Sequence, residues 1–270
     1  MKQTFTYHTS PFGYITSPLF EKHGIKHAFT TRCGGVSGGV YESLNFAAGT
    51  GEKPDGRENI LKNHDIAASL FQMNKSDICK SYQTHSGNVE KVTRGDRGRG
   101  LTSPSFGHGV DGLVCKEEGV LLSVRGADCV TLILCDPKAR VCGAVHSGWR
   151  GTAAKIAAKA VEKMTELGAK RENLLAAIGP SARVCCYRVG EELRETFISA
   201  DPNFALCFKN RDDGLFLDLQ MANAMVLTQA GIKDDHISDC GECSVCRPDR
   251  YFSHRRSGAE RGTMAAFITN

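Results

Sequence analysis

The chain has 270 residues, 41% of them hydrophobic and 24% charged, as in an ordinary soluble globular protein with a full core. Its 34 basic and 30 acidic residues leave a formal charge of +4, too small a surplus to indicate nucleic-acid binding. No apolar run approaches the ~20 residues of a membrane span, and the N-terminus lacks the pattern of a secretory signal. We therefore expect a cytoplasmic protein, and the absence of linkers and repeats favours a single domain over residues 1–270.

In chain order, the first distinctive segment is the glycine-rich basic stretch at 93–100, which we expect to be a mobile surface loop. Apolar runs then predict three strands, at residues 120–124, 130–135 and 140–146. Cys129 and His146 stand at the start and at the end of neighbouring strands in this scheme. Strand ends are common positions for functional side chains.

Apolar residues recur at helical spacing from 153 to 167, until Gly168 stops the pattern. The predicted helix begins directly after His146, so its free amides should face the same region and bind an anion together with Arg150. The remaining elements are a strand at 173–178, a helix at 190–198, a strand at 215–219, a helix at 220–229 and a strand at 264–268. This mixture lacks the regular alternation of a doubly wound fold and favours an α/β or α+β sandwich.

Three short segments carry side chains suited to metal binding or nucleophilic attack: Gln83-Thr84-His85, Ala127-Asp128-Cys129 and His146-Ser147-Gly148. Two imidazoles and one thiolate would make a three-ligand zinc site with an open fourth position, the pattern of a catalytic metal. Their spacing matches no local metal motif. A hydrogen-bonded structural histidine or a buried cysteine therefore remains the alternative for each of them.

The sequence contains 12 cysteines. In a reducing compartment, free buried thiols are expected rather than disulfides. Cys240, Cys243 and Cys246 form two overlapping two-residue spacings that suggest a metal knuckle, but His254 is the only nearby candidate for a fourth ligand. We favour a loop without a metal here.

The ordered motifs of the chain resemble those of the laccase-domain family over about residues 28 to 268. The motifs are residues 29–37 (FTTRCGGVS), 41–45 (YESLN), 83–85 (QTH), 127–129 (ADC), 146–152 (HSGWRGT), 179–180 (GP) and 252–256 (FSHRR). Members of this family were first described as multicopper polyphenol oxidases and later as zinc-dependent purine nucleoside phosphorylases.

The resemblance implies a single-domain α/β/β/α sandwich with mixed sheets, similar to cysteine-hydrolase folds. It also implies that His85, Cys129 and His146 bind Zn²⁺ in the active site, with Cu²⁺ as the alternative ion. The implied partners are small molecules only: adenosine, inosine or S-methyl-5'-thioadenosine with phosphate, and adenosine for deamination. We expect a monomer or homodimer that binds neither nucleic acid nor membrane.

Physical reasoning adds candidate roles. Zinc lowers the pKa of bound water to about 7, which would supply hydroxide for deamination. Arg150 and Arg32 are candidates for binding phosphate, because guanidinium groups match phosphate oxygens. Asp128 could orient a ligand or transfer a proton, and Asn45 could contact the sugar or phosphate. Packing and turn-capping roles are the alternatives for these four residues.

Three other functions stay open at this point. Cys129 and His146 could act as nucleophile and base of an amidohydrolase that edits a peptidoglycan precursor. A copper-dependent polyphenol oxidase is weaker, because its copper clusters need more histidines than nine scattered ones supply. A non-catalytic binding protein stabilised by zinc is the third. Arg188 stands where the family often has an acidic residue, and would favour anionic groups.

Overall fold

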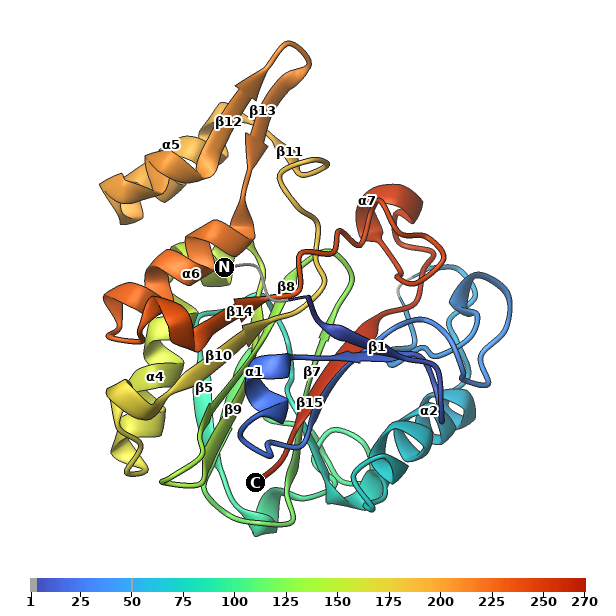
Figure 1. Ribbon diagram of the computed structural model, residues 1–270. Coiled ribbons are helices and arrows are strands. Elements are labelled where there is room, and N and C mark those ends of the chain that lie inside the picture. The colour runs from blue at the N-terminus through green and yellow to red at the C-terminus, as the bar shows by residue number, and fades with distance from the viewer. Residues whose placement is uncertain (1–3, 50) are drawn as a thin grey trace.

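The computed structural model describes residues 4–49 and 51–270 and contains two six-stranded sheets (Figure 1). In spatial order, the first sheet consists of β1 (Thr6–His8), β2 (Tyr14–Thr16), β3 (His27–Thr30), β15 (Met264–Ile268), β7 (Leu121–Gly126) and β4 (Ile78–Lys80). The second consists of β14 (Ile237–Asp239), β10 (Leu175–Ile178), β8 (Val130–Asp136), β9 (Val141–Ser147), β6 (Gly112–Cys115) and β5 (Val89–Val92). Both sheets are mixed, since β4–β7, β5–β6 and β10–β14 are parallel pairs among antiparallel ones.

The two sheets pack face to face through one apolar core. Val124 and Ala266 of the first sheet belong to the same buried cluster as Ile133 and Ala144 of the second. The outer face of the second sheet is covered by α4 (Ile156–Glu166) and α6 (Leu219–Gln229), and the first sheet by α2 (Arg57–Ser69). β8 and β9 are buried throughout, as expected for strands covered on both faces. The predicted α/β/β/α sandwich is confirmed.

A small third sheet and several short helices lie outside the two main sheets. A third sheet of β11 (Arg188–Val189), β13 (Gly214–Leu217) and β12 (Phe208–Arg211) packs with α5 (Glu191–Ala200) and protrudes at the top of Figure 1. The short helices are α1 (Pro18–Glu21), α3 (Trp149–Ala153) and α7 (His254–Ser257). The 3₁₀ helices are η1 (Gly39–Tyr41), η2 (Lys75–Asp77), η3 (Arg94–Asp96), η4 (Arg171–Asn173), η5 (Pro202–Cys207) and η6 (Asp234–His236). Within the described residues, no helix is both long and apolar enough to span a membrane.

The helix predicted after β9 differs from the structure. The single helix expected at 153–167 is divided into α3 and α4, because Lys155 adopts the left-handed conformation with φ 53°. Lys155 Nζ lies 2.8 Å from Asp201 Oδ2, an ion pair that holds this junction. The division lets α4 lie along the second sheet while α3, only five residues long, stays at the end of β9.

Candidate metal centre and its pocket

The three predicted ligands come together where the chain crosses between the two sheets. His85 lies on the loop from β4 to β5, and Cys129 on the turn from β7 to β8. His146 lies near the end of β9, whose antiparallel pairing opposes Ser147 to Val130. One ligand atom from each residue lies within 4.8 Å of the others. The structure therefore assembles a set of two imidazoles and one thiol from three separate segments.

The backbone is strained at this site. His85 (φ 61°) and Asp128 (φ 85°) are two of the five described non-glycine residues in the left-handed region that side chains disfavour. Such conformations cost of order 1–3 kcal/mol each and persist only where surrounding contacts enforce them. These backbone conformations set the direction of the His85 side chain and the path of the turn that carries Cys129.

Gly148 forms the wall behind the ligands. A Cβ atom at this position would lie 3.0 Å from His85 Cδ2 and 3.1 Å from Cys129 Sγ. Both distances are shorter than ordinary van der Waals contacts. A side chain at this position would press on both groups unless they moved by a few tenths of an ångström, so the close approach favours glycine.

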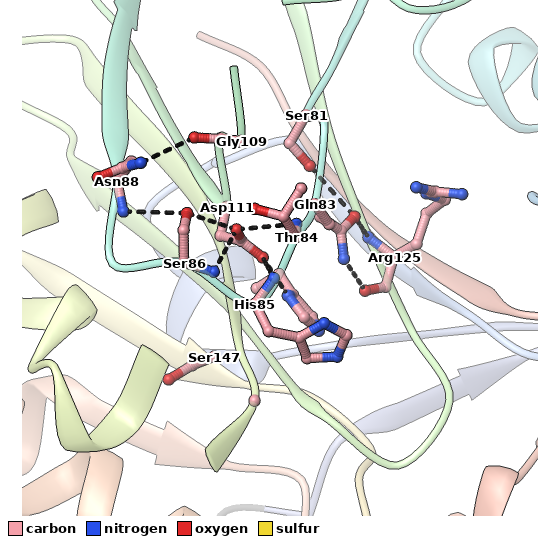
Figure 2. Close-up of polar contacts among 12 residues, drawn as sticks. Ser81, Gln83, Thr84, His85, Ser86, Asn88, Gly109, Asp111, Arg125 and Ser147 are labelled. Carbon is pink, nitrogen blue, oxygen red and sulfur yellow. Dashed lines mark hydrogen bonds and ion pairs between the residues drawn. The ribbon is translucent and has the colours of Figure 1, made fainter. Parts of the chain in front are cut away.

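A buried carboxylate, Asp111, orients two of the three ligands (Figure 2). Its Oδ1 accepts hydrogen bonds from His146 Nδ1 at 2.7 Å and from the amide of His85 at 3.0 Å. Its Oδ2 accepts bonds from the amides of Thr84 and Ser86 and from the Ser86 hydroxyl. Because Nδ1 of His146 donates to Asp111, Nε2 is left to face the ligand set. Our sequence reasoning missed Asp111, since no motif links it to residues 35 positions away.

The pKa values describe a coupled pair of thiol and imidazole. Burial opposes ionisation of Cys129, but His146 and His85 lower its pKa to about 6. Burial also opposes protonation of His146, but Cys129 and Asp111 raise its pKa to about 9. Both shifts favour the thiolate form of Cys129, which is the form that binds a metal or attacks an electrophile.

The ligand set opens into a cavity of about 400 Å³, within the usual size range of small-molecule pockets. Two arginines, Arg125 and Arg261, line it, and the buried Nε atom of each has no hydrogen-bond partner among residues 4–49 and 51–270. Gln83 fixes the backbone of Arg125 by accepting from its amide at 2.8 Å and donating to its carbonyl at 2.7 Å (Figure 2). The remaining lining residues are Ala47, Ala48, Gly49, Gly126, Ala127 and Thr263. Arg125 and Arg261 therefore place two positive charges beside the three predicted ligands. The sequence analysis did not identify either arginine.

The carboxylate of Asp128 faces away from this cavity. It accepts hydrogen bonds from the hydroxyls of Ser244 and Ser253, at 2.6 and 3.0 Å, and from the amide of Arg255 at 2.6 Å. These contacts join the turn before Cys129 to the C-terminal loops. Asp128 therefore has contacts that would position the turn carrying Cys129.

The other predicted residues lie outside the cavity lining. Arg32 donates to the carbonyls of Glu42 and Pro248 and stacks on Phe252. Arg150 is exposed, with its guanidinium 4.1 Å from the centre of the Trp149 ring. Arg188 is exposed on β11.

Asn45 has a structural setting next to the cavity. It is fully buried, donates to Asp55 at 2.8 Å and accepts from the amide of Thr263 at 2.9 Å. Its Nδ2 also donates to the carbonyl of Ala47. Asn45 thereby joins two segments that line the cavity, near Ala47 and near Thr263.

Known proteins resemble this chain over nearly its whole length. The sequence model of the family described as multi-copper polyphenol oxidoreductase laccase matches residues 26–270. The purine nucleoside phosphorylase YlmD of Geobacillus stearothermophilus is 36% identical over 258 residues, 91% of this chain and 90% of the relative. The adenosine deaminase RL5 of an unknown prokaryotic organism is 33% identical over 239 residues, 87% of this chain and 90% of the relative. The crystal structure of YlmD from Geobacillus stearothermophilus matches with a TM-score of 0.88 at 32% identity, covering 98% of both chains.

Proposed function

The chain belongs to the multi-copper polyphenol oxidoreductase laccase family, as its motifs predicted, and we propose that it is a zinc-dependent purine nucleoside phosphorylase. Its substrates would be adenosine, inosine and S-methyl-5'-thioadenosine, and it would also deaminate adenosine. The observation that carries the proposal is the joint presence of His85, Cys129 and His146 with two arginines around one cavity. The names of the relatives support it at the level of nucleoside chemistry.

The donor set fits zinc. Two imidazole nitrogens and one thiolate are ligands that Zn²⁺ prefers, and three protein ligands leave a fourth position for water or substrate. When bound, zinc would act as a Lewis acid and lower the pKa of water to about 7. Asp111 holds His146 in the tautomer that leaves Nε2 free to coordinate.

Phosphorolysis requires a place for phosphate beside the sugar. A phosphate oxygen bonds to C1' of the ribose while the bond from C1' to N9 breaks. The electron pair leaves with the purine, which takes up a proton. We assign phosphate binding to Arg125 and Arg261, because both side chains line the cavity, their Nε groups have no partner among the described residues, and guanidinium groups match phosphate oxygens. In deamination, a water oxygen bonds to C6 of adenine and the amino group leaves as ammonia.

Incubation of the purified, zinc-loaded protein with adenosine and phosphate tests the proposal. We expect adenine and ribose 1-phosphate, and inosine as the product of deamination when phosphate is omitted. The His85→Ala variant should form neither above background. Equal product formation by His85→Ala, or no product from the wild type, would contradict the proposal.

Steady-state kinetics can test whether Arg125 and Arg261 bind phosphate. Replacing Arg261 by Met should raise the KM for phosphate about 10- to 100-fold, the loss of one or two charge-assisted hydrogen bonds. Phosphate-independent deamination should change much less. Arg150→Met is the matched variant, because Arg150 was predicted from the sequence but lies outside the lining. A larger KM effect from Arg150→Met than from Arg261→Met would reverse the assignment.

A second candidate function is supported by the arrangement of Cys129, His146 and Asp111. A thiolate, an imidazole and an orienting carboxylate in this order are the elements of a cysteine hydrolase. Such an enzyme would cleave an amide, for instance in a peptidoglycan precursor. A thiol-reactive probe distinguishes the two functions: Cys129 should be protected until a chelator is added if it binds zinc, and labelled at once if it is a free nucleophile. The peptide that contains Cys129, identified by mass spectrometry, provides the readout.

A further inference from the structure

Four cysteine thiols from two distant segments meet beside β10 and β14. The Sγ atoms of Cys185, Cys186, Cys243 and Cys246 all lie within 4.8 Å of one another. Cys246 Sγ is 3.7 Å from Cys185 Sγ and 3.4 Å from Cys186 Sγ, and all four are free thiols. Cys243 and Cys246, which the sequence suggested as part of a metal site, are thus joined by Cys185 and Cys186 from an earlier segment of the chain.

The other sequence candidates for this group lie elsewhere. Cys240 is buried in the core between the two sheets. His254 Nδ1 makes a hydrogen bond with the carbonyl of Gly258 instead. The group of four thiols therefore consists of Cys243 and Cys246 together with the adjacent pair Cys185 and Cys186.

The fold brings the two segments together without help from the thiols. β10 and β14 are parallel neighbours, so the loops that leave their carboxyl ends start side by side. Ser181 forms a β-bridge with Cys243, and its carbonyl accepts the amide of Ser244 at 3.0 Å. Arg183 binds both carboxylate oxygens of Asp239, at 2.8 and 2.7 Å. These contacts preorganise the thiols.

The sulfur separations, 3.4 and 3.7 Å for two pairs and within 4.8 Å for all, are compatible with four ligands around a single tetrahedral ion. Zinc bonds thiolate at about 2.3 Å, and a tetrahedron of that size places its sulfurs about 3.8 Å apart. We propose that Cys185, Cys186, Cys243 and Cys246 bind a structural zinc ion with all four positions filled by sulfur. An iron–sulfur cluster would insert several atoms between the cysteines and hold them further apart. This site is separate from the one at His85, Cys129 and His146, and does not depend on the proposed function.

Two arginines stand next to the loops that carry the cysteines. Arg211 donates to the carbonyl of Cys185 at 3.4 Å, and Arg256 donates to the carbonyls of Ser244 and Val245 at 3.0 and 2.9 Å. Four thiolates and one Zn²⁺ carry a net negative charge. The guanidinium groups therefore offset charge at the site while they fix the loops.

The cysteine site connects directly to the pocket. Ser244, between Cys243 and Cys246, donates to Asp128 at 2.6 Å, and Asp128 forms the strained turn before Cys129. Tyr187, next to Cys186, lies under the guanidinium of Arg255. The amide of Arg255 in turn donates to Asp128. A zinc ion here would fix both loops that hold this turn.

Metal analysis of purified variants tests the proposal. We expect the Cys185→Ser/Cys246→Ser variant to contain about one zinc per chain less than the wild type. Cys33→Ser is the matched control, since Cys33 is half-buried and outside both ligand groups, and it should retain the wild-type content. His85→Ala/Cys129→Ala reports on the other site. If His85→Ala/Cys129→Ala keeps the wild-type zinc content while Cys185→Ser/Cys246→Ser loses one zinc, the site at the four cysteines is supported. The proposal of a zinc-dependent enzyme is then contradicted.

A spectroscopic measurement covers the case in which the cysteine variant does not fold. X-ray absorption of zinc in His85→Ala/Cys129→Ala, where all four cysteines are intact, should show sulfur ligands only, at about 2.3 Å. Nitrogen or oxygen ligands, unchanged zinc in Cys185→Ser/Cys246→Ser, or iron in place of zinc would overturn the proposal. So would a disulfide among these cysteines, found by alkylation and mass spectrometry without reductant.

Discussion

Asp111 shows how one residue outside the ligand set can control it. Its carboxylate is fully buried and accepts bonds from the imidazole of His146 and from three successive amides of the His85 loop. Burial raises its pKa, but His146 and Ser86 lower it to about 2, so it stays ionised. One carboxylate therefore orients the imidazole of one proposed ligand, His146, and fixes the backbone of another, His85.

Replacing Asp111 by Asn tests this role. The amide would direct one NH₂ group at a donor, so we expect zinc affinity at the His85 site to fall about 10- to 100-fold. Competition with a chromophoric chelator measures the affinity. Asp136→Asn is the control, since Asp136 is equally buried and accepts the amides of Lys138, Ala139 and Lys170 far from the site. A similar loss in both variants would show a general stability effect instead.

His27 links the stability of the protein to pH. It is buried, its Nδ1 lies 2.8 Å from the carbonyl of Ile25, and its Nε2 accepts the amide of Ser17 at 2.7 Å. Protonation of Nε2 would replace an acceptor by a donor. Burial is the main reason that the pKa of His27 falls to about 4, against about 6.5 in an unfolded chain.

A folded-state pKa below the unfolded value means that the neutral histidine supports the fold above about pH 6.5. This contribution is lost progressively as the pH falls from about 6.5 to about 4. We expect His27 alone to reduce the free energy of unfolding by about 1 kcal/mol between pH 7 and pH 5.5. Urea unfolding of His27→Gln should lack this part of the pH dependence. The exposed His23, replaced by Gln, should leave the wild-type dependence intact, and a wild-type slope in His27→Gln would refute the assignment.

At the scale of elements, a buried hydroxyl–amide network joins the end of β9 to two helices. Ser147 donates to Asn223 on α6 at 2.7 Å and bonds to Thr152 on α3 at 2.9 Å. Asn223 completes the triangle by donating to Thr152 and also to the carbonyl of Leu219. The network fixes α3, and with it Gly148, relative to the strand that carries His146.

Replacing Asn223 by Ala should lower the free energy of unfolding by about 1–3 kcal/mol, because buried hydroxyls lose their partners. The exposed Asn210 on β12 is the control, and its change to Ala should stay within about 0.5 kcal/mol. A double-mutant cycle with Ser147→Ala, followed by urea unfolding, measures the coupling. Strictly additive effects would show that the two side chains act independently.

For the whole molecule, the two proposed metal sites predict two stages of zinc removal. The site at His85 has three protein ligands and opens into a cavity, so a chelator should take its ion first, with loss of activity and little change in Tm. The ion at the four cysteines should leave later, with a fall in Tm. Zinc content, turnover and thermal unfolding can be followed in one titration. Simultaneous loss of activity and fold would favour a purely structural role for zinc.

The sequence predicted the central strands well, since β7, β8, β9, β10 and β15 are mainly apolar and almost wholly buried. It did not predict the break between α3 and α4, because the apolar spacing continues through Lys155 and the left-handed residue there is held by the tertiary partner Asp201. The ordered 3₁₀ turn at Arg94–Asp96 was expected to be a mobile loop. Asp96 accepts the amide of Thr93 and pairs with Arg99, which fixes this turn.

For the site, residue type and family resemblance named the three proposed ligands, and the fold brings their candidate ligand atoms within 4.8 Å of one another. Asp111, Arg125 and Arg261 could not be found in this way, because their roles depend on which loops meet at the junction of two sheets. The same limit hid the partners of Cys243 and Cys246. Only the parallel pairing of β10 with β14 places Cys185 and Cys186 beside them.

Gly148 has a consequence for the range of ions that the proposed metal centre could accept. Side chains adapt to a larger or smaller ion by changing rotamer, but a peptide unit held between β9 and α3 has no such freedom. The wall nearest to the imidazole of His85 and the thiol of Cys129 is made of this rigid backbone. If the three side chains bind an ion, the main chain at Gly148 would limit how far the imidazole and the thiol can move apart to accommodate a larger one.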